Sequence, residues 1–229
     1  MFHSLGYATG HLDVVVLDHS HVVKPHAVVG SASVLYCKFV ENSETWCAAV
    51  MAVEYPESAL SNWFVDIIMA KTEKLAGKKV DVGIVNFGGI RIDMPEGDII
   101  LDDMLSMFPF KNQLVYVEHT GKQIRAILEK MAADRFQVLG GVRVVAEGGK
   151  LVSAEIGGEP IDDEKVYGLA TITFLLEGGD NLTLAENAVS ITTFEQEDII
   201  DAVLEYVYAE TAAGRPIEYQ TDGRVVIKD

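Results

Sequence analysis

Short apolar segments alternate with amphipathic segments along residues 57–229, and this alternation is the feature that most constrains the fold. Apolar residues at helical spacing follow Ser58, whose hydroxyl can cap a helix, and Gly77 ends that pattern. Residues 80–85 (VDVGIV) then have the composition of a short buried strand. Such alternation is typical of a mixed α/β domain.

The alternation continues to the C-terminus. Further helices are expected after Asp102, after Thr120 and over the apolar face that begins at Ile199. Further strands are expected at residues 114–118, 142–146, 151–156, 166–174 and 224–227. The glycine pair at 148–149 indicates a hairpin between two of them. No repeat or proline-rich linker interrupts this pattern, so we expect one domain at residues 54–229, preceded by a segment of uncertain fold at residues 1–53.

The net charge of the chain limits the classes of molecule that it is expected to bind. The chain carries 18 Lys and Arg against 35 Asp and Glu, a formal net charge of −17. Such a surface repels a phosphate backbone, so neither nucleic acid nor an anionic membrane is an expected partner. No apolar run reaches the ~18 residues of a membrane span, and the N-terminus lacks the pattern of a secretory signal. Either the protein stays inside the cell, or the sequence is that of a mature or truncated form.

Three glycine- or proline-bearing motifs carry the residues best suited to bind a ligand. The motifs are NFGGIR at residues 86–91, FPFKN at residues 108–112 and FLLEGGD at residues 174–180. Aromatic rings on two separate loops can clamp a flat ring, and a carboxylate can accept both hydroxyl protons of a ribose. The candidate substrate-binding residues are Asn86, Arg91, Phe110, Asn112, Phe174 and Asp180.

Each motif has a purely structural explanation as well. Phe110 and Phe174 adjoin apolar runs, where an aromatic side chain also suits a hydrophobic core. Arg91 could pair with the carboxylates that follow it, and Asp180 could cap a loop. Residue spacing alone therefore leaves a nucleoside pocket and ordinary folded loops as alternatives.

Six sequence blocks, in order, resemble the C-terminal domain of the 5'-nucleotidase family. The blocks are PESALSNWFVDIIM (56–69), VNFGGIR (85–91), FPFKNQLV (108–115), HTGKQI (119–124), LGGVRV (139–144) and ATITFLLEGGD (170–180). The resemblance implies a layered mixed-sheet α/β fold that holds the nucleotide. It also implies that a separate N-terminal metallophosphatase domain, with two metal ions, performs the hydrolysis.

The resemblance assigns a role to most of the candidate residues. Phe110 and Phe174 match the two rings that sandwich the base. Asn86 and Arg91 match residues that contact ribose and phosphate. Asn112 matches an amide on the base side.

Asp180 matches the carboxylate on the ribose hydroxyls, but two positions depart from the family pattern. Many members have a basic residue near the phosphate where this chain has Tyr55 and Pro56. Lys111 stands where a small residue is more usual. Losing the first cation weakens phosphate binding, and Lys111 either compensates for it or obstructs the pocket.

One fragment resembles part of the missing metallophosphatase domain. Residues 12–21 (LDVVVLDHSH) are similar to the strand and loop that supply two late histidine ligands, which makes His19 and His21 candidates for a metal role. Asp18 replaces the usual glycine, and the earlier aspartate and asparagine motifs are missing from the sequence. We therefore expect no metal or cofactor on this chain, and two divalent metals on a partner domain.

The expected function is that of the nucleotide-binding domain of a 5'-nucleotidase-type hydrolase in nucleotide catabolism. It would recognise a nucleoside monophosphate or nucleoside, and hydrolysis would depend on a separate two-metal phosphatase chain, so enzymatic activity of this chain alone stays open. The alternatives are a non-catalytic nucleoside-binding or sensing module and an interaction protein with a degenerate pocket. The family resemblance implies a periplasmic or cell-envelope location, whereas the location is cytoplasmic if the absence of a secretory signal is real.

Overall fold

Helix α1 (Ala59–Ala76) is the central helix of the computed structural model, which describes residues 45–228. The Ser58 hydroxyl accepts a hydrogen bond from the backbone N–H of Ser61, and the Ser61 hydroxyl accepts one from the N–H of Ser58. Gly77 ends the helix in the left-handed conformation at φ 61°. Both ends of the helix therefore lie where the sequence predicts.

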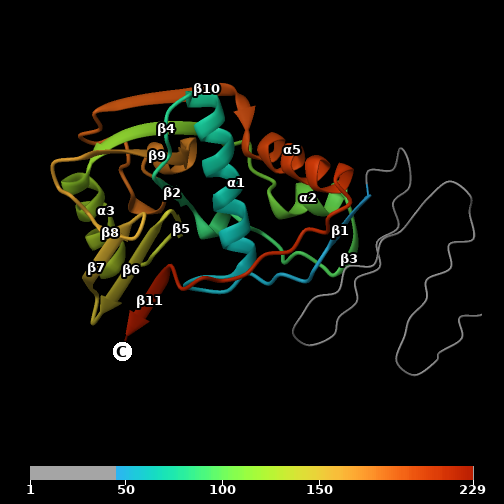
Figure 1. Ribbon diagram of the computed structural model, residues 1–229, viewed down its shortest axis with the longest axis horizontal. Helices are drawn as coiled ribbons and strands as arrows, with labels where there is room; N and C mark the ends of the chain where they lie inside the picture. The colour runs from blue at the N-terminus through green and yellow to red at the C-terminus, as the bar shows by residue number, and fades with distance from the viewer. Residues whose placement is uncertain (1–44, 229) are drawn as a thin grey trace, which may run out of the picture.

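A mixed sheet of five strands lies against α1 (Figure 1). Its strands, in spatial order, are β10 (Ser190–Asp198), β4 (Gln113–Thr120), β9 (Val166–Ile172), β2 (Val82–Val85) and β5 (Val138–Gly140). β2 and β9 are parallel, and the other neighbours are antiparallel. The buried side chains of α1, among them Trp63, Phe64 and Ile68, form the hydrophobic core with this sheet.

A second sheet of four strands packs beside the first. Its order is β11 (Val225–Lys228), β6 (Val142–Glu147), β7 (Lys150–Ile156) and β8 (Glu159–Pro160). The predicted hairpin is confirmed, because Glu147 pairs with Lys150 across the glycine turn. Helix α3 (Gly121–Ala133), capped by Thr120, contacts both β4 and β7 and so joins the two sheets.

The other described elements lie around this core. They are the two-stranded sheet of β1 (Thr45–Ala48) and β3 (Gly97–Ile100) and the helices α2 (Leu101–Met107), α4 (Thr173–Leu176) and α5 (Ile199–Ala212). Ala48 and Met51 are buried, and Met51 exchanges backbone hydrogen bonds with Met94. Residues 45–52 thus pack on the unit that the sequence assigns to residues 54–229. The mixed α/β architecture is confirmed.

Five strands of the structure have no clear signal in the sequence: β1, β3, β5, β8 and β10. The first four contain only two to four residues each, too few to show a period. β10 has nine residues but lies at the edge of its sheet, and its side chains are exposed or half-buried. A strand without a buried face shows no alternation of apolar and polar residues.

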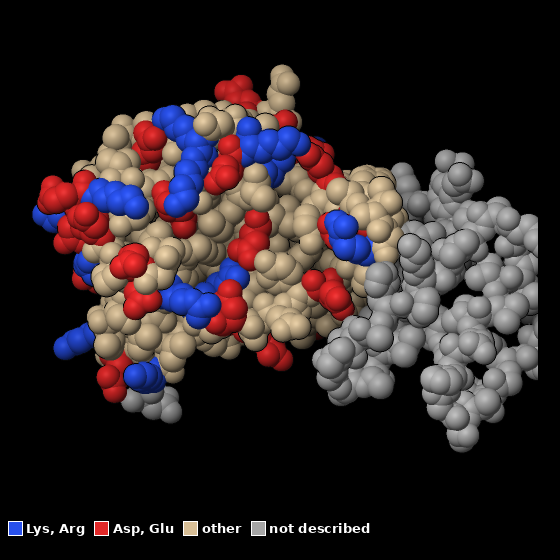
Figure 2. Space-filling view, in the orientation of Figure 1, with Lys and Arg blue, Asp and Glu red and all other residues tan. Residues whose placement is uncertain are grey.

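Charged side chains on the drawn face of the molecule are not segregated by sign. Figure 2 shows Lys and Arg side chains interspersed with Asp and Glu on the face that it draws, without a large patch of one sign. Within residues 45–228, no helix combines the length and the apolar character required to cross a bilayer.

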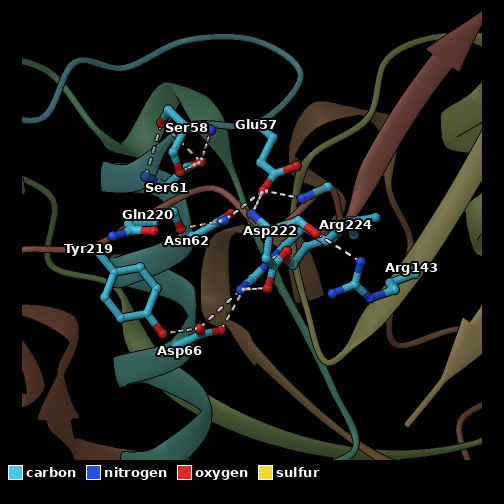
Figure 3. A network of polar contacts seen from close by, with 12 residues as sticks. Glu57, Ser58, Ser61, Asn62, Asp66, Arg143, Tyr219, Gln220, Asp222 and Arg224 are labelled. Atoms are coloured by element: carbon cyan, nitrogen blue, oxygen red, sulfur yellow. Dashed lines mark hydrogen bonds and ion pairs between the residues drawn. The ribbon is translucent and has the colours of Figure 1, made fainter. Parts of the chain in front are cut away.

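A polar network around Arg224 ties the C-terminal segment to α1 (Figure 3). The Arg224 side chain is only 8% exposed; its guanidinium donates to Asp66 at 2.8 Å, to Asp222 at 2.8 Å and to the Leu139 carbonyl at 3.2 Å. Burial opposes its charge, but the hydrogen bonds with Asp222 and Asp66 outweigh burial and raise the pKa of Arg224. The Glu57 carboxylate adds a bond of 2.7 Å from the Asp222 N–H.

Replacing Arg224 tests how much this network stabilises the fold. Arg224→Met leaves the Leu139 carbonyl without its side-chain donor and two carboxylates without their cation, so we expect a loss of about 2–3 kcal/mol in the free energy of unfolding. Urea unfolding followed by circular dichroism measures it. Arg215→Met is the matched control, because Arg215 is exposed and pairs with Glu210 at the surface; its unfolding midpoint should stay close to that of the wild type. Equal midpoints for both variants would contradict this account.

Candidate functional site

A cleft of about 380 Å³ opens at one edge of the five-stranded sheet. Its lining residues are Asn86, Gly88, Phe110, Lys111, Asn112, Phe174 and Asp180. Five of the six candidate residues therefore line one cleft, although they come from three separate motifs. Arg91 is the candidate that is not part of the lining.

Strand topology explains why the three motifs meet. β2 and β9 are parallel, so the loops that follow their carboxyl ends leave the sheet at the same edge. β4 is antiparallel to β9, and Leu114 at its start pairs with Ile172 at the end of β9. The segment before β4 therefore reaches the edge that the loops after β2 and β9 also reach.

The structure distinguishes the two phenylalanines of the FPF segment. Phe108 is 2% exposed and stacks on Phe64 of α1, with ring centroids 4.4 Å apart and an interplanar angle of 24°. Phe110, two residues later, is 45% exposed. Phe174 on the facing loop is 39% exposed. Phe108 anchors the segment in the core and leaves Phe110 in the cleft.

The strand predicted for residues 166–174 is too long. β9 ends at Ile172, and Thr173 begins the short helix α4, which carries Phe174. The Phe174 N–H donates to Asn112 Oδ1 at 3.2 Å instead of to a neighbouring strand, and the Thr173 hydroxyl donates to the same oxygen at 3.3 Å. Asn112 thus joins the two loops that carry the aromatic rings.

Asn86 lines the cleft and has a buried polar atom without a partner among the described residues. The side chain is buried, and its Oδ1 has no hydrogen-bond partner among the described residues. A Cβ at position 89 would lie 2.8 Å from this oxygen, so Gly89 leaves the room that the amide occupies. Gln137, which sequence reasoning missed, accepts the Phe87 N–H at 3.1 Å and holds the turn. A buried acceptor without a partner costs free energy unless a ligand donates to it.

Arg91 lies beside the cleft. Its Nη1 donates to the Gly88 carbonyl at 3.1 Å, and its guanidinium carbon lies 5.7 Å from the centre of the Phe110 ring. Within residues 45–228 it forms no ion pair, so pairing with a neighbouring carboxylate does not explain it. The nearby Asp93 accepts the Val53 N–H instead. The other donors of Arg91 are open to a ligand at the rim.

Asp180 stands in a turn that adopts left-handed backbone conformations. Gly178 has φ 99° and Asp180 has φ 49°, a value that aspartate tolerates better than most residues. A Cβ at Gly179 would lie 2.5 Å from the Phe174 ring, so the ring packs directly on this backbone. Lys111 also lines the cleft, and no ion pair joins its ammonium to Asp180.

No metal centre is found in the part of the chain that the structure describes. No cluster of three or more His, Cys, Asp or Glu side chains there could hold an ion. His19 and His21, the candidate metal ligands of the sequence, lie outside the described residues.

Comparison with known proteins identifies the family. The family model for the "5'-nucleotidase, C-terminal domain" matches residues 28–187. The chain belongs to the 5'-nucleotidase C-terminal domain family. This domain is 34% identical over 119 residues to protein UshA of Salmonella pullorum, and 30% identical over 151 residues to protein UshA of Escherichia coli.

The match covers only part of each relative. The aligned regions are 50% and 63% of this chain but 22% and 27% of the two UshA proteins. Among solved structures, a 5'-nucleotidase precursor from Thermus thermophilus is similar with a TM-score of 0.71 and 24% identity, over 82% of this chain and 39% of the other. These comparisons confirm the family and the layered mixed-sheet fold, and the roles of the cleft residues stay predictions.

The close contact between Gly179 and Phe174 predicts the effect of a single methyl group. Gly179→Ala should displace the Phe174 ring from the cleft, because the added Cβ would overlap the ring. Gly88→Ala is the matched control, since a Cβ there meets only the Asn86 amide nitrogen at an ordinary 3.6 Å. Crystal structures of both variants measure the ring position. A Phe174 ring that stays in place in Gly179→Ala would contradict the packing described here.

Proposed function

We propose that this 5'-nucleotidase C-terminal domain binds a nucleoside monophosphate in the cleft, with the base between Phe110 and Phe174. The observation that carries the proposal is that two exposed aromatic rings from separate loops line one cleft of about 380 Å³. Stacking of a base on an aromatic ring contributes about 1–3 kcal/mol. The cleft volume lies within the range of small-molecule sites.

Polar groups at the cleft suit the rest of a nucleotide. The Asp180 carboxylate can accept both hydroxyl protons of a ribose, and the buried Asn86 oxygen is a further acceptor without a protein partner among the described residues. The Arg91 guanidinium donates one hydrogen bond to the Gly88 carbonyl, and its other N–H groups can donate to a phosphate. These contacts give each part of a nucleoside monophosphate a partner of matching chemistry.

Hydrolysis, in this proposal, belongs to a separate two-metal phosphatase chain. Two-metal hydrolysis needs ligands that hold both ions close together so that they activate water and stabilise the phosphoryl oxygens. Residues 45–228 offer no such cluster. This division of labour distinguishes the proposal from a nucleoside sensor, which would bind without any phosphatase. The periplasmic or cell-envelope location implied by the family resemblance stays a prediction.

Removing one ring tests the binding proposal. Phe174→Ala should weaken the binding of AMP and IMP by at least about 1 kcal/mol, because it removes one stacking surface from the base. Isothermal titration calorimetry on the 229-residue chain measures the dissociation constants. Phe174→Tyr keeps an aromatic ring and should bind within a few-fold of the wild type. An unchanged affinity in Phe174→Ala would assign the ring a structural role only.

A reconstitution experiment tests the division of labour. The chain alone should release no phosphate from AMP above the uncatalysed rate, and adding a metallophosphatase chain with Mn²⁺ should produce release that depends on both proteins. The expected dependence follows from placing base recognition on one chain and the two metals on the other. Nucleotide binding without phosphate release in any assembly would instead support the sensor.

A further inference from the structure

The hydrogen bonds of Asn112 determine which part of its amide can reach a ligand. Its Oδ1 accepts from the Phe174 N–H at 3.2 Å and from the Thr173 hydroxyl at 3.3 Å, and a carbonyl oxygen has two lone pairs. The Phe174 N–H can only donate, so Oδ1 and not Nδ2 must face it. The Asn112 amide nitrogen has no partner among the described residues. Towards the cleft, Asn112 is therefore a donor only.

Lys111 supplies a second donor to the same cleft. Its side chain is exposed and lines the same cleft, between Phe110 and Asn112 in the sequence. An ammonium group has three donors and no acceptor. Among residues 45–228 it forms neither a hydrogen bond nor an ion pair. The segment that carries the Phe110 ring thus offers two neighbouring donors and no free side-chain acceptor.

We propose that this donor pair makes the cleft select a 6-oxopurine nucleotide over an adenine nucleotide. The inference rests on the proposed function and adds the class of base to it. Guanine and hypoxanthine present two acceptors, O6 and N7, on one edge, whereas adenine presents N7 beside an amino group that donates. Asparagine reads adenine with both its oxygen and its nitrogen. In this cleft the Asn112 oxygen already accepts two hydrogen bonds, so the amino group of a bound adenine, itself a donor, would face other donors.

The acceptors of the cleft lie on other loops. Asp180 follows the Phe174 ring, and Asn86 follows β2; both suit the hydroxyl groups of the ribose. No ion pair draws Lys111 towards Asp180. The sequence left two roles open for Lys111, a substitute phosphate ligand or an obstruction. Its place in the same cleft as the free Asn112 donor favours a third role, as a determinant of base specificity.

The experiment compares two nucleotides that share the same ribose phosphate. Calorimetry on the 229-residue chain with IMP and AMP should show IMP binding about tenfold more tightly. Lys111→Met removes one donor and should reduce this ratio to about threefold or less. Asn112→Asp keeps an oxygen for the Phe174 N–H but replaces the free donor by an acceptor, so it should bring the ratio to one or below.

Control measurements separate the possible outcomes. Lys150→Met, a matched loss of charge on β7, should keep the wild-type ratio. Equal affinities for IMP and AMP in the wild type would overturn the base preference and leave the proposed function standing. Binding of neither nucleotide would overturn the proposed function itself. If Lys111→Met weakens both nucleotides equally and leaves inosine and adenosine unchanged, Lys111 contacts phosphate and its assignment to the base is wrong.

Discussion

The packing of α1 against the five-stranded sheet is the interaction on which the rest of the structure depends. Val65 of α1 lies against Gly83 of β2, and the buried ring of Phe64 stacks on Phe108. The polar side of the helix organises other segments, since Asp66 binds Arg224 near the C-terminus. Lys71 of the same helix forms an ion pair with Glu205 of α5. One helix thus contacts a loop of the cleft, the segment of the last strand and a second helix.

The positions of the cleft residues depend on this helix and sheet. These residues lie in loops and short helical turns, and each of these connections begins or ends at a strand of the five-stranded sheet. The buried Phe108 holds one loop to α1, and the Asn112 oxygen links that loop to the one carrying Phe174. Loops held by buried rings and shared hydrogen bonds can keep two exposed aromatic side chains in position without a ligand.

The polar side chains of the cleft differ from those around Arg224 in whether they have hydrogen-bond or ion-pair partners. Arg224 forms ion pairs with both Asp66 and Asp222, as expected of groups that only stabilise the fold. In the cleft, the oxygen of Asn86 and the ammonium of Lys111 lack partners within the described residues. Unpaired polar groups gathered beside exposed aromatic rings are what a polar, flat ligand requires.

The sequence by itself determined the features that depend on neighbouring residues. Ser58 and Gly77 set the ends of α1, and the glycine pair at 148–149 set the hairpin, because caps and turns are encoded within a few residues. The six ordered motifs also sufficed to identify the family. Five of the six candidate residues line one cleft and Arg91 does not, and their roles in binding stay predictions.

Only the tertiary structure decided the features that depend on distant pairing. Asn112 and Phe174 are 62 positions apart, and no local pattern shows that one accepts a hydrogen bond from the other. Likewise, Phe108 and Phe110 are chemically identical in the sequence, and the contact with α1 alone makes the first a core residue and leaves the second exposed. The hydrophobic periodicity of a segment predicts which of its own residues are buried. The Asn112–Phe174 hydrogen bond and the burial of Phe108 depend instead on contacts between segments that are distant in the sequence and meet only in the folded protein.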